Sequence, residues 1–376
     1  MFTANDEAME PNAPDTSNFL NWVEIKNFKS IKDLRLDCKR VNIFIGKPNV
    51  GKSNILEALG ILGADLYTDG FMKGAVRYKD LKHLFYQNNA VDGLEVRTEY
   101  LRGSLGKDQT DKDRFLYLFE TNYIELENEN STKRLNLAEV IVGYSDTKNY
   151  FQYLSNAGEI KNIEKSMDYK EDATFVKNYD FFGVTEFIDS FRNFLLPNGK
   201  NLFNVIDRRK DLKNEFGKLF LEQGLDLVLD QENQSFNLQR KDGFYIYKYD
   251  FYTIADTFQR FMFYIAAIES NENSVIVFEE PEVHSFPPYT QDVAYRMIYS
   301  ADNQFFVSTH SPYLLQTLVE NLGDDQLSVF VTYYENYETK VKALTAEELS
   351  FVQEYSTDVF FNLDRFIPTP NATSVS

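Results

Sequence analysis

Cysteine is almost absent from this chain, since Cys38 is the only one among 376 residues. A single cysteine excludes a disulfide within the chain and fits a reducing compartment. Long apolar runs are also missing, because no stretch approaches the roughly 18 residues that a helix needs to cross a bilayer. The acidic segment 1–18 lacks the basic and apolar regions of a secretion signal, and we expect it to be a disordered leader. These absences predict a soluble cytoplasmic protein without a membrane partner.

Positive charge is scarce as well: 39 lysines and arginines stand against 58 aspartates and glutamates, for a formal net charge of −19. A chain this acidic repels the phosphate backbone, so we do not expect it to coat nucleic acid over its whole surface. The local basic stretch DRRKDLK at 207–213 is compatible with a nucleic-acid contact, although such runs are more often a solvated helix face. Direct DNA binding is therefore kept as an alternative.

The most informative motif that is present lies near the start of the chain. An apolar, strand-like stretch, Val41–Ile45, leads into Gly-x-x-x-x-Gly-Lys-Ser at 46–53. Apolar residues then recur at helical spacing, at Ile55, Leu56, Leu59 and Leu62. Strand, glycine-containing loop and helix are the context of a P-loop, whose backbone N–H groups bind phosphate. A glycine turn that merely precedes a helix is the less specific alternative.

Each residue type of a P-loop has a chemical task. Gly46 and Gly51 allow backbone conformations that other residues avoid. Lys52 places a positive charge between the β- and γ-phosphates, and the Ser53 hydroxyl is a ligand for Mg²⁺. The predicted nucleotide-binding residues are Gly46, Lys47, Pro48, Asn49, Val50, Gly51, Lys52, Ser53 and Asn54. The expected cofactors are ATP and Mg²⁺.

A second motif, SVIVFEEPEVHSF at 274–286, ends a strand-like apolar run with adjacent carboxylates. Desolvating two neighbouring carboxylates is costly unless they hold a cation or exchange a proton. In the presence of a P-loop, Glu279 fits the acid that holds Mg²⁺, usually through water, and Glu280 fits a general base for the attacking water. Taken alone, the EEPE sequence would be read as a solvated acidic turn. The P-loop in the same chain favours the functional interpretation.

Three segments together resemble a known family. WVEIKNFKSIKDLRLD at 22–37, followed by the P-loop, is similar to the start of ABC-type ATPases of the RecF, SMC, Rad50 and OLD group. VIVFEEPEVHSFPP at 275–288 is similar to their extended Walker B motif, with the Glu-Glu pair that is frequent in the OLD-like branch. QFFVSTHSPYLLQTL at 304–318 resembles the strand, switch histidine and helix of these proteins. The resemblance therefore covers both ends of the chain.

The resemblance implies an α/β fold, a P-loop NTPase of ABC type with a mixed central sheet flanked by helices, an antiparallel β lobe and a helical insertion. We expect five parts: the leader, an ATPase core at 19–100 and 251–345, an insertion or helical lobe at 101–250, and a C-terminal helix with a polar tail at 346–376. The resemblance also implies that His310 is catalytic and contacts the γ-phosphate or the attacking water. A lone histidine at a strand end is otherwise more often structural.

The signature motif of the family, which reaches the ATP of the other subunit in a dimer, is degenerate here. YTIADTFQRFMFYIAAIES at 252–270 takes its place, with Ala255 where serine is usual and Thr257 where glycine is usual. The helix dipole remains, but the Thr257 backbone approaches phosphate less freely than glycine. The candidate contacts across a dimer are Asp256, Thr257, Gln259 and Arg260. The alternative is a core helix with a polar start.

Two features of related proteins are not expected here. No sustained heptad pattern occurs between Lys52 and Ile254, where SMC and Rad50 proteins carry coiled-coil arms. Short strands are predicted at 94–101, 114–126 and 136–144, and short helices at 167–196 and 212–225. The 66 residues after His310 are too few for the TOPRIM nuclease domain of OLD proteins, and they predict a strand pair, a helix and a polar tail. Nuclease activity, if associated, would belong to another chain.

Three functions are compatible with these motifs. The first is the sensor or scaffold ATPase of a two-component anti-phage defence system, similar to the ATPase of PARIS systems. Such a protein would form at least a dimer and control a separate effector, such as a TOPRIM nuclease, in response to a phage protein. The second is a RecF-like repair ATPase that binds DNA, and the third is a nucleotide-dependent scaffold with slow or negligible hydrolysis.

Overall fold

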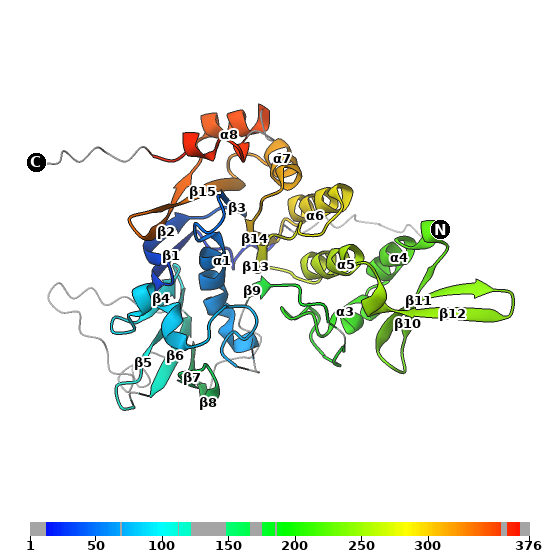
Figure 1. Cartoon of the computed structure of the whole chain (residues 1–376), viewed down its shortest axis with the longest axis horizontal. Helices are drawn as coiled ribbons and strands as arrows, with labels where there is room; N and C mark the ends of the chain where they lie inside the picture. The colour runs from blue at the N-terminus through cyan, green and yellow to red at the C-terminus, as the bar shows by residue number, and fades with distance from the viewer. Residues whose placement is uncertain are drawn as a thin grey trace, which may run out of the picture.

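The computed structural model describes residues 13–67, 70–111, 113–121, 148–165, 175–184, 186–354 and 359–368. These residues form three β-sheets with helices packed against them (Figure 1). The strand predicted at 136–144 and most of the predicted leader lie outside the described residues. The end of that leader is described, and Asn18 makes two hydrogen bonds to Asn273 (3.0 and 2.9 Å). Residue 18 therefore already belongs to the folded body.

The central sheet is mixed, with the strand order β16-β15-β3-β14-β13-β9. Its strands are β3 (Val41–Gly46), β9 (Val176–Tyr179), β13 (Ser274–Glu279), β14 (Asn303–Ser308), β15 (Leu327–Glu335) and β16 (Glu338–Ala343). Neighbouring strands run parallel, except for the antiparallel pair β15 and β16 at one edge. Strand β14 thus lies between β3 and β13, although it follows both of them in the chain.

The inner strands of the central sheet are buried on both faces, which explains the apolar runs IFI in β3, VIVF in β13, FFV in β14 and VFV in β15. Along β13, Ile276 and Phe278 belong to one core, whereas Val275 and Val277 belong to the other. The first core packs against α3 (Leu202–Arg208), α4 (Lys210–Lys218), α5 (Asp256–Glu269), α6 (Pro287–Tyr299), α7 (Pro312–Asn321) and α8 (Ala346–Glu354). The second core contains α1 (Lys52–Gly60). Among the described helices, none has the length and apolarity that a membrane span requires.

A seven-stranded antiparallel sheet covers α1 and forms the predicted antiparallel lobe. In the order β2-β1-β4-β5-β6-β7-β8 its strands are β1 (Trp22–Phe28), β2 (Ile31–Asp37), β4 (Leu94–Arg97), β5 (Leu101–Lys107), β6 (Arg114–Thr121), β7 (Lys148–Ser155) and β8 (Ile160–Lys165). The boundary expected between residues 100 and 101 falls inside this sheet, because β4 and β5 are neighbours. The predicted class, α/β with a mixed sheet and an antiparallel lobe, is confirmed.

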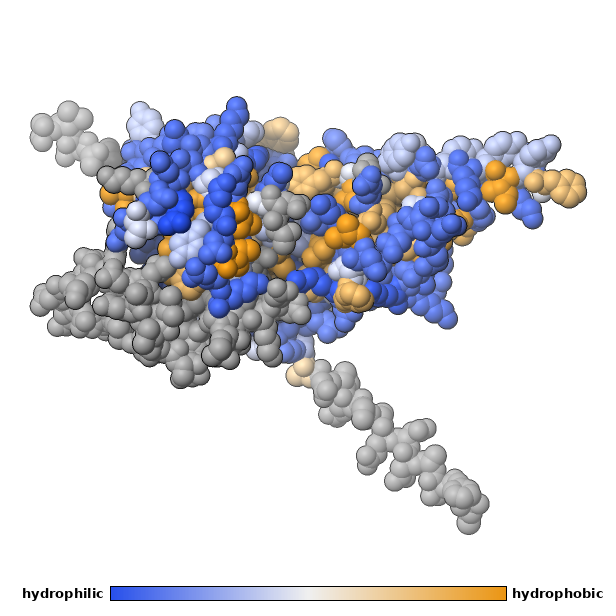
Figure 2. Space-filling model, turned by 90° about the horizontal axis from the view of Figure 1, so that it is seen from below, coloured by the Kyte–Doolittle hydropathy of each residue, from blue (hydrophilic) through white to orange (hydrophobic). Residues whose placement is uncertain are grey.

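The third sheet is an arm that projects from the helical side of the molecule (Figure 1). It consists of β10 (Asp226–Asp230), β11 (Ser235–Asp242) and β12 (Tyr245–Asp250), with β12 at its edge. Every residue of β12 is exposed, and Phe244 stands at the turn between β11 and β12. In Figure 2 the arm extends to the right and ends in a hydrophobic tip. The described part of the expected insertion at 101–250 is therefore largely β-structure, and its described α-helices are α3 and α4.

The helix predicted over 167–196 is wrong for the part that the structure describes. Residues 176–179 form β9, and the chain from 186 to 200 consists of turns and irregular segments. Parallel pairing with β13 explains the strand, since it buries Tyr179, whose hydroxyl donates to the Leu195 carbonyl (2.5 Å). The helix predicted over 212–225 is confirmed by α4 and η4. The 3₁₀ turns are η1 (Ile61–Leu66), η2 (Leu81–Leu84), η3 (Tyr86–Asn88), η4 (Leu221–Gln223), η5 (Phe251–Thr253) and η6 (Leu363–Arg365).

Candidate functional site

The loop between β3 and α1 has the backbone shape of an anion site. Asn49 (φ 62°) and Gly51 (φ 102°) are both left-handed, a conformation that asparagine and glycine tolerate best. Such residues turn successive N–H groups toward one side and form a concave nest for anions. Helix α1 starts directly after Gly51, and the described residues supply no side-chain cap for it. The free N–H groups of its first turn therefore add to the same site.

Strands β15 and β16, which are distant in sequence, pack against this loop. A Cβ atom on Gly51 would lie 2.0 Å from Thr339 Oγ1, and one on Gly46 would lie 2.4 Å from the Thr332 carbonyl oxygen. Thr339 Oγ1 also donates to the Val50 carbonyl (2.9 Å). The β15–β16 hairpin thus leaves room only for glycine at both positions of the motif. The sequence analysis predicted the glycines and a strand pair after His310, which β15 and β16 confirm, but not that this pair packs against the loop.

Other residues of the predicted loop already have partners within the chain. Asn54 Nδ2 donates to Ser30 Oγ (2.6 Å), so this side chain fastens α1 to the turn between β1 and β2. Lys47 Nζ bonds both carboxylate oxygens of Asp364 (2.7 Å each) in η6. Lys47, Pro48 and Asn49 are exposed and Val50 is buried. The side chains of Lys47 and Asn54 therefore fix the edges of the loop.

The Lys52 ammonium lies inside the loop and faces the acids. Its Nζ donates to the carbonyl oxygens of Gly46 and Lys47 (3.0 Å each), and the residue is buried. Burial lowers the pKa of Lys52, whereas the charges of the glutamates at the end of β13 act in the opposite direction. The structure thus brings the lysine of the first motif together with the carboxylates of the second, across more than 220 positions of the chain.

Ser53 and Glu279 lie in contact, as the Ser53 hydroxyl donates to Glu279 Oε1. A hydroxyl and a carboxylate are the oxygen ligands that Mg²⁺ prefers. The described residues include no group of three or more histidine, cysteine, aspartate or glutamate side chains placed to hold a metal by themselves. The other ligands of a magnesium ion here would be phosphate oxygens and water, as is usual at nucleotide sites. The residues present therefore fit a nucleotide-bound magnesium ion.

Glu280 and His310 form the second pair, with His310 Nε2 3.4 Å from Glu280 Oε1. The backbone of Glu280 is left-handed (φ 45°), and its N–H donates to the Ser308 carbonyl (3.0 Å). This backbone bond ties the loop after β13 to the end of β14. Burial and the nearby charge of Lys52 lower the pKa of His310, against a smaller opposing effect of Glu280. A lowered pKa favours the neutral form of the imidazole.

Two charged residues beside these pairs were missed by the sequence analysis. Arg77 Nη2 lies 3.6 Å from Glu279 Oε1, and its Nε donates to the buried carboxylate of Glu57 on α1 (2.9 Å). Asp180 follows β9 directly, and the register of Tyr179 with Phe278 places it beside Glu279. Strand β9, with the sequence VKNY, is only half apolar, so the signal for Asp180 was no more than its place after a short strand. The local sequence around Arg77 carries no comparable signal.

Asp180→Asn should stabilise the nucleotide-free protein at pH 8 but not at pH 4. Burial, then the charge of Glu279, raises the pKa of Asp180 from 3.8 to about 6. The folded state thus holds this proton more firmly than the unfolded chain, so stability is lost as the pH rises from about 4 to about 6. Allowing for partial exposure, we expect a gain on the order of 1 kcal/mol at pH 8. Denaturant unfolding with a chelator present measures it at both pH values.

The exposed Asp226, substituted in the same way, is the control for that measurement. It should change the unfolding free energy little at either pH. A gain from Asp180→Asn that is the same at pH 4 and pH 8 would contradict the assigned titration.

The residues predicted to reach a second subunit are engaged within the chain. Asp256 Oδ2 contacts Arg260 Nε (2.7 Å) and His284 Nδ1 (2.9 Å). Thr257 Oγ1 donates to the His284 carbonyl (2.6 Å), which ties the loop after β13 to the start of α5. Gln259 is buried and donates to the Ile254 carbonyl (2.8 Å). The Gln259 amide is thus bonded within the core, and contacts of these four residues with a second subunit stay a prediction.

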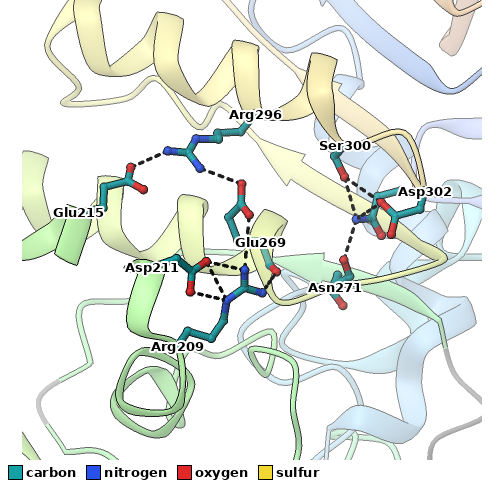
Figure 3. A network of polar contacts seen from close by, with 9 residues as sticks. Arg209, Asp211, Glu215, Glu269, Asn271, Arg296, Ser300 and Asp302 are labelled. Carbon is teal, nitrogen blue, oxygen red and sulfur yellow. Dashed lines mark hydrogen bonds and ion pairs between the residues drawn. The ribbon is translucent and has the colours of Figure 1, made fainter. Parts of the chain in front are cut away.

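The basic stretch 207–213 contributes to packing between helices. Arg209 Nη2 pairs with Asp211 (2.7 Å) and lies 3.6 Å from Glu269 on α5. Arg296 of α6 forms ion pairs with Glu269 (2.9 Å) and with Glu215 of α4 (2.7 Å). Figure 3 shows the two arginines on either side of Glu269. The charge of Arg209 is therefore compensated by nearby carboxylates, and the stretch does not present a free basic surface at this residue.

Comparison with known families gives a match over residues 19–242, more than half of the chain, to a family described as AAA ATPase domain. An uncharacterized protein of Methanocaldococcus jannaschii, MJECL10, is 36% identical over 93 residues, which cover 22% of this chain and 42% of that protein. The chain thus spans less than half the length of this curated relative. The family match contains the loop at 46–53 and ends before α5, so Glu279, Glu280 and His310 lie beyond it.

Similar solved structures include two heads of SMC proteins. One is an SMC head bound to the C-terminal winged-helix domain of ScpA, with 14% identity, a TM-score of 0.45, and coverage of 89% of this chain and 99% of that chain. The other, derived from Pyrococcus furiosus, is an SMC head with an extended coiled coil bound to the C-terminal domain of ScpA. It has 12% identity, a TM-score of 0.46, and coverage of 89% and 98%.

Proposed function

Since this chain belongs to the AAA ATPase domain family, we propose that the site at the ends of β3, β13 and β14 binds ATP with Mg²⁺ and hydrolyses it. The observation that carries the proposal is the meeting of three groups at one loop. These are the buried Lys52, the Ser53–Glu279 contact and the Glu280–His310 pair. Each group matches one requirement of phosphoryl transfer: charge compensation, a metal ligand set and a base for water.

Each of these residues has a separate role in ATP hydrolysis. Backbone N–H groups of the loop and of α1 bind the β- and γ-phosphates, and Lys52 supplies positive charge beside them. Ser53 and Glu279 would hold Mg²⁺, which neutralises phosphate charge when it is bound. Glu280 accepts the proton of the water whose oxygen attacks the γ-phosphorus, while the bond to the bridging oxygen breaks and ADP leaves. The neutral His310, next to Glu280, orients that water by hydrogen bonding.

At a finer level, we propose that ATP turnover in an oligomer of this chain controls a separate effector, as in two-component anti-phage systems. The proposal rests on the resemblance of the EEPE motif to the OLD-like branch and of the His310 segment to the wider group of these ATPases. It is also supported by the described α-helices between Lys52 and Ile254, which are at most nine residues long and are too short to form a coiled-coil arm. The exposed edge strand β12 offers backbone groups to another chain.

Co-purification with the product of the neighbouring gene tests this finer proposal. We expect a complex whose size and effector activity change between ATP and ADP, measured by size-exclusion chromatography and a nuclease assay. A chain that stays alone, with or without nucleotide, would overturn the effector role. Retention of duplex DNA at low salt, with a steep loss of affinity as salt rises, would instead favour the RecF-like alternative.

A further inference from the structure

The third glutamate of the acidic motif has no task in the chemistry described above, yet it is largely buried between two loops. Glu282 Oε1 accepts two hydrogen bonds, one from Thr309 Oγ1 (2.8 Å) and one from the backbone N–H of His310 (2.7 Å). Its other oxygen, Oε2, is buried and has no hydrogen-bond partner among the described residues. Burial raises the pKa of Glu282, and the charge of Glu280 adds to this, whereas the two bonds act against it.

The two bonds join loops that leave neighbouring parallel strands. Strands β13 and β14 are in register up to Glu279 and Ser308. The backbone bond from Glu280 to Ser308 continues this pairing by one residue. Glu282 then adds a side-chain bond to the peptide that carries His310. Thr309 is held in the same way, because its hydroxyl donates to Glu282 and accepts from the Ser311 N–H (2.9 Å).

We infer that Glu282 is a positioning residue: it holds the backbone of His310 so that the imidazole faces Glu280. This inference deepens the proposed function and rests on it. Both hydrogen bonds end on Glu282 Oε1. This one acceptor atom therefore holds the two loops together, and Oε2 does not contribute. A buried oxygen without a partner disfavours the charged carboxylate, since an ionised group there would be poorly solvated. The neutral acid also adds no third negative charge to Glu279 and Glu280 beside a triphosphate.

A matched pair of substitutions separates the acceptor atom from charge and volume. Glu282→Gln keeps an accepting oxygen, whereas Glu282→Met has a similar volume and no strong acceptor. We expect the kcat for ATP hydrolysis of Glu282→Gln to lie within about threefold of the wild type, and that of Glu282→Met to fall by about 10²-fold. The KM for ATP should change by less than about threefold in both, because neither variant alters the loop at 46–53.

A role through His310 also predicts that the two losses do not add. In a His310→Ala background, Glu282→Met should lower kcat by less than about threefold further. Full additivity would overturn the inference, as would equal kcat values for Glu282→Gln and Glu282→Met. The dependence of kcat on pH should be the same for Glu282→Gln and the wild type. If one limb of the wild-type profile is missing in Glu282→Gln, the ionisation of Glu282 takes part in the reaction and the inference is wrong. This measurement tests the inference even if Glu282→Met does not fold.

Failure of this inference and failure of the proposed function give different results. A wild-type protein that binds no ATP and releases no phosphate would remove the proposed function itself. A wild-type protein that hydrolyses ATP, with Glu282→Gln and Glu282→Met indistinguishable, would remove only the role of Glu282.

Discussion

Glu280→Gln is expected to lower the kcat for ATP hydrolysis by about 10²-fold or more while ATP binding stays close to that of the wild type. Glu279 is engaged by the Ser53 hydroxyl, whereas the carboxylate of Glu280 contacts His310. Glu280 is therefore the glutamate of the pair that is placed to accept a proton from water. A glutamine keeps the size and the hydrogen-bond acceptor but takes up no proton at neutral pH. The backbone at φ 45° is no harder for glutamine than for glutamate. The substitution therefore isolates the proton transfer.

Phosphate release under saturating ATP, together with the affinity for a fluorescent ATP analogue, measures both parts of this expectation. Glu320→Gln is the matched control, since Glu320 is an exposed side chain on α7 that pairs with Gln316, away from the motif. It should leave both quantities unchanged. An undiminished rate in Glu280→Gln would favour the alternative of a scaffold whose nucleotide is hydrolysed slowly by other means.

Lys52→Ala is expected to weaken ATP binding by at least about 10²-fold and to reduce hydrolysis to background. Lys52 is buried inside the loop, where its ammonium bonds the carbonyl oxygens of Gly46 and Lys47. Its removal therefore takes away the positive charge of the site and also frees two carbonyl groups that shape the loop. Both effects act on the same phosphate-binding segment.

Lys47→Ala is the control for this second prediction, because it removes a lysine of the same loop whose side chain is exposed and pairs with Asp364. We expect a change in ATP affinity of less than about fivefold, as surface ion pairs contribute little. Thermal unfolding of both variants shows whether they are folded. Retained ATP binding in a folded Lys52→Ala protein would mean that the loop at 46–53 is not the phosphate site.

Local patterns predicted several elements well. The glycine motif between an apolar strand and an amphipathic segment predicted β3 and α1, and the runs before Glu279 and His310 predicted β13 and β14. These elements are short-range consequences of composition and period, which a single sequence carries. The helix expected over 167–196 is wrong where it is described, because pairing with β13 overrides the local preference at β9.

The remaining parts of the site depend on long-range pairing. Strand β14 separates β3 from β13, which sets His310 between the loop and the acids, and no local pattern specifies that order. The same applies to Arg77 beside Glu279 and to Thr339 behind Gly51. Glu282 was visible as a third acid in the motif, but its bond to the His310 backbone appears only once the two loops are side by side.

The sequence by itself thus determined which chemical groups this protein has and which short elements carry them, because residue type and spacing act over a few positions. Only the tertiary structure decided which of these groups meet. Parallel strands that are joined by long connections can be ordered in several ways, and burial of both faces of the central sheet selects one of them.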